Sequence, residues 1–289
     1  MQTRKGLNWL LFVTLAFIWG SSFILMKIGK EYLNGYQIGS IRIASAGAVF
    51  LPFAIFHIGK LPRKKLPLIL LSGMLGNLLP AFLFAIAIEK IDSSLEGILN
   101  SLTPLFVILI SVLFFKAKLH RQKIAGVLIG FIGLVILSLS SGFSSSHYVY
   151  ALLILLATLF YGINVNLVNY YLKGIDPMKM ASVSLAMVSI PAFFVVWQQE
   201  VFSIAVYDEE ARWSIAASVL LGIMGSALAT ALFYVLIKRS GGLFASLVTY
   251  AIPIVAIFWG VLSGETVSIF QVACLAVILG GVYLVNRSS

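Results

Sequence analysis

Residues 7–28 read LNWLLFVTLAFIWGSSFILMKI, an apolar stretch of the length that a membrane-spanning helix needs. A helix crosses the hydrocarbon core of a bilayer with about 20 consecutive apolar residues. Nine further stretches of similar composition follow along the chain, and short loops that carry most of the charges separate them. Because lipid admits only helices and closed barrels as spanning structures, the sequence predicts an all-α integral membrane protein with ten transmembrane helices.

The composition supports a membrane protein over a soluble one. The chain has 289 residues, of which 61% are hydrophobic and 10% are charged, and its mean hydropathy is +1.05. A soluble domain does not need so much apolar surface. The net charge of +10 comes from basic residues that lie mostly in loops. Contact with membrane lipid therefore accounts for the composition, and we expect no nucleic-acid partner.

Consecutive spans are joined by short loops and must run antiparallel. The predicted spans are Leu7–Ile28, Tyr36–Phe56, Leu66–Ile88, Leu95–Phe115, Ile124–Ser140, Val149–Leu172, Met178–Trp197, Ile215–Ile237, Gly242–Leu262 and Ile269–Val285.

The distribution of basic residues predicts the orientation. With the amino terminus placed in the cytoplasm, fifteen of the twenty Lys and Arg residues fall on cytoplasmic segments or the adjoining helix ends. Of the ten acidic residues, only Asp176 lies on that side. Since basic residues set the orientation of membrane proteins, we predict a multi-pass protein of the bacterial inner membrane with both termini in the cytoplasm.

The two halves of the chain resemble each other. A shift of 149 residues places 66–140 on 215–289 without a gap, and a shift of 142 aligns the first two helices of each half. The matches include Gly73 with Gly222, Gly76 with Gly225, Phe84 with Phe233, Pro104 with Pro253, Gln122 with Gln271, and Trp19-Gly20 with Tyr161-Gly162. We therefore divide the chain into two five-helix repeats, residues 1–141 and 142–289.

The odd number of helices in each repeat has a mechanistic consequence. The second repeat enters the membrane from the opposite side, which makes the pair an inverted repeat. Two inverted halves around a site at mid-depth can exchange conformations and give alternating access to that site.

A set of residues along the chain carries a family resemblance. They are Phe17–Phe23 (FIWGSSF), Lys27, Arg42, Pro104, Pro253, Gly264-Glu265 and Gln271. In this combination the chain resembles the EamA-type transporters of the drug/metabolite transporter superfamily, over its whole length and as two EamA-like repeats. The resemblance implies that the first, third and fourth helices of each half surround a central cavity. It also implies small organic solutes, often amino acids or other metabolites, that are usually exported.

Polar and aromatic residues inside these spans are the candidate cavity lining, because polar side chains at membrane depth tend to face a cavity or a partner helix. They are Trp19, Ser22, Asn77, Asn100, Thr103, Tyr161, Asn164, Thr230, Tyr234, Thr249 and Tyr250. Such a cavity suits a medium-sized, partly apolar zwitterion. For the hydroxyl residues, a hydrogen bond within their own helix or to a neighbour is the alternative. Pro104 and Pro253 are expected to break their helices, since proline lacks the backbone N–H.

Three ionisable residues near or within the spans need separate interpretation. Glu96, near the start of the fourth span, is the candidate proton site, with facilitated diffusion and exchange as alternatives to coupling. Lys27 and Arg42 we interpret as structural salt-bridge or interface residues.

No enzyme signature is present in the sequence. It has no phosphate-binding Gly-Lys-Ser/Thr loop, no Gly-x-Ser-x-Gly and no His-Glu-x-x-His. Its single cysteine, Cys274, allows no disulfide framework. We therefore expect no enzyme activity, no cofactor and no metal.

The function we predict is secondary transport of a small-molecule substrate such as an amino acid, with export as the favoured direction. A flippase or carrier of a lipid-linked substrate on the same fold is one alternative, and a membrane scaffold without transport is another. Assembly as a homodimer is left open.

Overall fold

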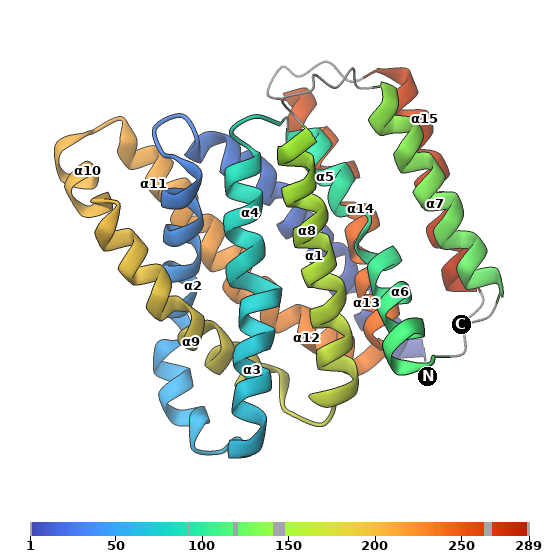
Figure 1. Ribbon diagram of the computed structural model, residues 1–289, viewed down its shortest axis with the longest axis horizontal. Coiled ribbons are helices and arrows are strands. Elements are labelled where there is room, and N and C mark those ends of the chain that lie inside the picture. Colours follow the sequence, from blue (N-terminus) through green and yellow to red (C-terminus); the bar gives the residue numbers. More distant parts are fainter. Residues whose placement is uncertain (1, 92, 118–120, 141–147, 263–267, 288–289) are drawn as a thin grey trace.

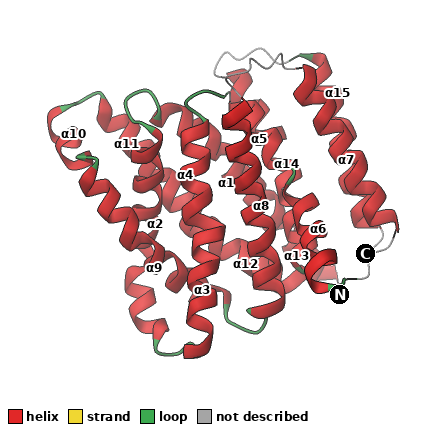
Figure 2. Cartoon of the chain, viewed as in Figure 1, coloured by secondary structure: helices red, strands yellow, loops and turns green. Residues whose placement is uncertain are grey.

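The computed structural model describes residues 2–91, 93–117, 121–140, 148–262 and 268–287. Within these ranges the chain forms helices joined by short loops, with no strand (Figure 2). Seven of the described helices are long and apolar enough to cross a membrane. Three shorter apolar helices, Thr103–Phe115, Ile124–Gly133 and Val272–Gly281, lie where the remaining predicted spans were expected. The protein is therefore a multi-pass helical membrane protein.

The first half comprises α1 (Gln2–Gly29), α2 (Gly35–Ile58), the 3-10 turn η1 (Arg63–Lys65), α3 (Leu66–Gly73), the π-helical turn η2 (Met74–Leu78), α4 (Leu79–Ala87), α5 (Ser93–Asn100), α6 (Thr103–Phe115) and α7 (Arg121–Ser140). The second half comprises α8 (Tyr148–Asn166), the π-helical turn η4 (Leu167–Tyr171), α9 (Pro177–Gln198), α10 (Val201–Tyr207), α11 (Ala211–Leu220), the π-helical segment η5 (Leu221–Leu228), α12 (Ala229–Ser240), α13 (Gly242–Ser246), α14 (Val248–Leu262) and α15 (Ile269–Arg287). The predicted boundary between the halves, at residues 141 and 142, lies outside the described residues.

Two of the predicted spans are interrupted in the structure. The fourth consists of α5 and α6, separated at Ser101 and Leu102, and Pro104 lies in the first turn of α6. The ninth is interrupted at Leu247, between α13 and α14. The expectation that Pro253 breaks its helix is not met, because α14 continues through this residue.

The helices pack in a pattern that repeats between the halves. The helix α2 packs along α9 at one side of the bundle, and α7 packs along α15 at the other (Figure 1). Between these pairs, α1 packs against α14, and α8 packs in the same way against α6. Thus α2 and α7 each pack against their own counterpart in the second half, and the contact of α1 with α14 is repeated by that of α8 with α6.

Local hydrogen bonds position the turn between the first two helices. Asn34 caps α2 in a reciprocal arrangement, in which its Oδ1 accepts from the Gln37 N–H at 2.9 Å and its own N–H donates to Gln37 Oε1. Tyr32, in the same turn, donates its hydroxyl hydrogen to Glu210. This bond to the carboxylate raises the pKa of Tyr32 above its ordinary value. At the opposite edge of the bundle, α1 begins and α15 ends (Figure 1).

Candidate functional site

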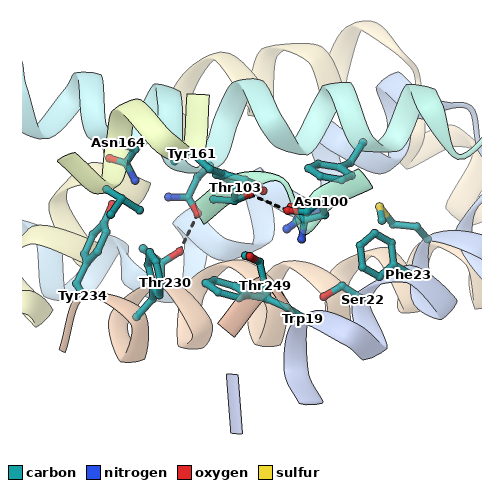
Figure 3. Close-up of a pocket in the computed structure, with 17 residues that line it drawn as sticks. Trp19, Ser22, Phe23, Asn100, Thr103, Tyr161, Asn164, Thr230, Tyr234 and Thr249 are labelled. Carbon is teal, nitrogen blue, oxygen red and sulfur yellow. Dashed lines mark hydrogen bonds between the residues drawn. The ribbon is translucent and has the colours of Figure 1, made fainter. Parts of the chain in front are cut away.

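A cavity lies at the centre of the bundle, between α1, α2, η2, α4, α5, α6, α8, α12 and α14 (Figure 3). It contains about 690 Å³ of unfilled space, its opening included. The structure brings ten of the eleven candidate lining residues together in its wall. They are Trp19, Ser22, Asn77, Asn100, Thr103, Tyr161, Asn164, Thr230, Tyr234 and Thr249.

The eleventh candidate, Tyr250, lies outside this cavity. Its hydroxyl approaches Gly130 of α7 instead, so that it faces the neighbouring peripheral helix. Neighbouring residues of a helix point about 100° apart. The adjacent Thr249 faces the cavity, whereas Tyr250 is directed toward α7.

A buried cluster of hydrogen bonds forms one end of the cavity. The Ser72 hydroxyl donates to Asn164 Oδ1 at 2.6 Å and lies 2.9 Å from the Tyr234 hydroxyl. Tyr234 also lines a second cavity, together with Lys173 and Lys238. The Tyr234 ring therefore separates the central cavity from a basic pocket near the ends of α8 and α12.

Two other wall residues are held by contacts between the halves of the chain. Trp19 donates its indole N–H to the Gly225 carbonyl at 3.0 Å, and its ring lies 5.0 Å from that of Phe233. Thr230 donates to Asn77 Oδ1 at 2.8 Å (Figure 3). These bonds connect α1 to η5, and η2 to α12.

Threonine side chains satisfy backbone carbonyls where the two broken spans lose their regular hydrogen bonds. Pro104 has no N–H to donate to the Asn100 carbonyl, which accepts instead from Thr103 Oγ1 at 2.8 Å. The Ser246 carbonyl likewise accepts from Thr249 Oγ1 at 2.8 Å. Both threonines line the cavity, so the interruptions of the helices lie at its wall.

Three side chains in this region have buried polar atoms without a hydrogen-bond partner among the described residues. They are Asn77 at Nδ2, Asn100 at Oδ1 and Glu96 at both carboxyl oxygens. Buried polar atoms are normally paired, so the two amides, which line the cavity, offer a donor and an acceptor to a ligand. Glu96 is fully buried on α5, one turn before Asn100, but does not itself line the cavity.

Sequence reasoning missed Arg42 as part of this wall. It lies on α2, which the expected arrangement assigned to a supporting role, and the residue was interpreted as structural. The side chain lines the cavity, and its Nε donates to Ser226 Oγ at 2.8 Å. An arginine inside an apolar span was the available signal, because a charge at membrane depth is costly and usually faces a cavity.

The remaining lining residues are mainly apolar. Phe23, Phe84 and Tyr161 form a row of rings, with centroid distances of 6.1 Å and 6.0 Å. The described residues contain no group of three or more His, Cys, Asp or Glu that could hold a metal ion. The chemistry that this wall offers is therefore hydrogen bonding, aromatic contact and one positive charge.

Comparison with known proteins identifies the family. The model of the EamA-like transporter family matches residues 7–139 and again residues 149–287. The chain belongs to the EamA-like transporter family. The family domain occurs in it as two repeats, which together occupy nearly the whole sequence.

Relatives of this EamA protein are also named as transporters. An uncharacterized transporter of Archaeoglobus fulgidus is 26% identical over 97% of this chain and 99% of its own length. The uncharacterized inner membrane transporter YedA of Escherichia coli K12 is 28% identical over 94% of this chain and 88% of its own length. A solved crystal structure with 18% identity shares the fold, with a TM-score of 0.71 over 98% of this chain and 97% of that chain.

Proposed function

We propose that this protein is a secondary transporter of the bacterial inner membrane that exports a small, partly apolar zwitterion such as an amino acid. In this proposal the chain crosses the membrane ten times, as two inverted five-helix repeats, residues 1–141 and 142–289. The repeats exchange conformations around the central cavity and expose it to each side in turn. The shared edge of the bundle at which α1 begins and α15 ends supports an even number of crossings.

The observation that carries the proposal is the composition of the cavity wall by corresponding residues of both halves. The register of the repeat pairs Trp19 with Tyr161, Ser22 with Asn164 and Phe84 with Phe233, and all six line the cavity. A site made from corresponding parts of two repeats changes its surroundings when either repeat moves. This arrangement supports alternating access more directly than it supports a scaffold.

The chemistry of the wall supports the solute class. Asn100 Oδ1 has no partner and can accept a hydrogen bond from an ammonium group, whereas Asn77 Nδ2 can donate to a carboxylate or amide oxygen. The aromatic row of Phe23, Phe84 and Tyr161 can contact an apolar side chain.

Glu96 is our proposed proton site. Its carboxyl group is fully buried without a hydrogen-bond partner, and an isolated ionised carboxylate is costly there. The charges of Arg42 on α2 and Lys30 in the turn after α1 act on Glu96. Tyr161 of α8 is a further titratable group, on which the charges of Arg42 and Glu96 act. A change of protonation at Glu96 therefore alters the charge balance beside the cavity.

Counterflow in proteoliposomes tests the transport proposal. Vesicles that contain the purified protein and an excess of unlabelled L-amino acids should accumulate external labelled L-phenylalanine, and vesicles without protein should not. Asn100→Ala should lower this uptake about tenfold at subsaturating solute, because a hydrogen bond to a charged group contributes about 1.5–3 kcal/mol. Asn8→Ala is the matched control, since Asn8 is only partly buried, bonds Arg239 and does not line the cavity.

Two further arms of the same assay test coupling and direction. An imposed proton gradient should accelerate transport by the wild type but not by Glu96→Gln, which cannot titrate. Overproduction in cells should increase resistance to a toxic amino-acid analogue if the solute is exported. Flux in which no amino acid takes part would contradict the solute class.

A further inference from the structure

Arg42 places a positive charge in the wall of the cavity. Among the described residues in the cavity wall, it alone carries a permanent charge. Its side chain is only 7% exposed, and the Ser226 hydroxyl holds Nε at 2.8 Å. Arginine has five N–H donors in a planar fork. Within the described chain, the bond from Nε to Ser226 is the one hydrogen bond that the guanidinium makes. Four donors on Nη1 and Nη2 therefore remain for a ligand.

The corresponding position in the second half shows whether the packing of α2 requires an arginine at position 42. A shift of 142 aligns Arg42 with Ser184 of α9. The packing agrees with this alignment, because the Arg42 carbonyl approaches Gly222 and the Ser184 carbonyl approaches Gly73, its counterpart in the first half. The second half thus builds the same helix contact with a small neutral side chain.

Glu96 breaks the symmetry of the repeat in the same way. A shift of 149 aligns it with Ala245, which is also fully buried. Both charged residues are therefore confined to one half of an otherwise corresponding pair of sites. A buried charge is costly unless it is paired, and Arg42 forms no ion pair with a described acid at 4.0 Å or less. Neither packing nor a structural salt bridge accounts for the guanidinium.

We propose that Arg42 binds the carboxylate of the transported solute through its Nη atoms and thereby selects solutes that carry this group. This proposal rests on the proposed transport function and specifies the solute class. Arginine pairs with carboxylates through two parallel hydrogen bonds, a geometry that lysine cannot reproduce. The aromatic row of Phe23, Phe84 and Tyr161 then receives the apolar part of the same solute.

The Arg42 proposal also explains the position of Glu96. The two charges lie close enough to act on each other. A solute carboxylate at Arg42 competes with the ionised form of Glu96 for the same positive charge. The charge of Arg42 therefore links the proton site to the solute site.

Three related probes separate the contribution of the carboxylate from that of the rest of the solute. L-phenylalanine has a carboxylate and an ammonium group, 3-phenylpropionate has only the carboxylate, and phenethylamine has only the ammonium group. Binding is measured as thermal stabilisation of the purified full-length protein in detergent, titrated with each probe to give a Kd. The variants are Arg42→Ser, which copies the residue of the second half, and Arg42→Lys. Arg63→Ser is the control, since Arg63 is an exposed arginine in η1.

The expected result is specific to the carboxylate. Arg42→Ser should raise the Kd of L-phenylalanine and 3-phenylpropionate at least tenfold and change that of phenethylamine less than threefold. Arg42→Lys should give an intermediate loss, and Arg63→Ser should leave all three values unchanged.

Each other outcome contradicts a definite claim. If carboxylate probes bind Arg42→Ser as tightly as the wild type, the Arg42 proposal is wrong while the transport proposal stands. If all three probes weaken equally, Arg42 has only a structural role. If the wild type binds none of the probes, both the Arg42 proposal and the proposed solute class are wrong.

Discussion

At the scale of single residues, the hydrogen bond from Thr230 to Asn77 offers a test of how the two halves hold the cavity wall. Thr230→Val keeps the shape of the side chain but removes the donor to Asn77 Oδ1. Because Asn77 Nδ2 already has no partner, the whole amide then lacks hydrogen bonds within the protein. We expect a loss of about 1–3 kcal/mol of stability, measured as a lower Tm of the purified protein in detergent.

Thr158→Val is the matched control for this prediction. Thr158 is a fully buried threonine of α8, and its hydroxyl donates to the Leu155 carbonyl of its own helix. That carbonyl is a helix acceptor and does not depend on the hydroxyl, so the control should lose less than half as much stability. Equal losses in both variants would show that the bond between the halves has no special importance.

The side chains that face the cavity could be predicted from the sequence only in part. Asn164 and Asn166 are both amides in one span, but Asn166 bonds the carbonyls of Val107 and Gly162, whereas Asn164 lines the cavity. Polarity alone could not decide between Thr249 and Tyr250, because the direction of each side chain depends on the rotation of the helix about its axis. Packing between distant helices sets this rotation.

At the scale of elements, the π-helical segments were not predicted. Apolar composition determines that a span is helical, but it does not distinguish α-helical from π-helical hydrogen bonding. The turn η2, at Met74–Leu78, and the segment η5, at Leu221–Leu228, overlap when the first is shifted by 149 residues. Both halves therefore have π-helical hydrogen bonding in the same helix. In the first half this segment contributes Gly76 and Asn77 to the cavity wall, and π-bulges are frequent at functional sites.

Close packing at η5 leads to a prediction about its glycine. A Cβ added at Gly222 would lie 2.0 Å from Ser45 Oγ and 2.2 Å from the Arg42 carbonyl oxygen. The carbonyl belongs to the backbone of α2, so Gly222→Ala must separate α2 from η5 and displace Arg42. We expect a loss of about 1–3 kcal/mol, a lower Tm and reduced binding of 3-phenylpropionate.

Gly280→Ala provides the comparison for this prediction within a helix of the same protein. A Cβ at Gly280 of α15 would meet nothing within 4 Å. Alanine favours the helical state by up to about 1 kcal/mol over glycine, so this variant should keep or slightly raise the Tm. A Gly222→Ala protein as stable as Gly280→Ala would contradict the close contact between α2 and η5.

At the scale of the whole molecule, the repeat that the sequence indicated also appears in the contacts between helices. Gly20 approaches Val255, and its counterpart Gly162 approaches Phe106, which corresponds to Val255 in the register of the repeat. Gly47 of α2 meets Ser189 of α9, its own counterpart. The sequence comparison could identify corresponding residues, but the pairing of helices across the molecule required three-dimensional packing.

The inversion of the two repeats can be tested with one matched pair of residues. The shift of 149 that aligns 66–140 also places Arg63, three residues before this stretch, on Arg212. Both are exposed arginines, in η1 just before α3 and at the start of α11. In inverted repeats these positions lie on opposite sides of the membrane, whereas parallel repeats place them on the same side.

Cys274 is replaced by Ala first, and Arg63→Cys or Arg212→Cys is then introduced. A membrane-impermeant maleimide should label the cysteine at 212 in intact cells, but the one at 63 only after permeabilisation, because the basic loops indicate that 63 is cytoplasmic. Labelling of both positions from the same side would exclude inversion and, with it, alternating access by exchange between the two halves.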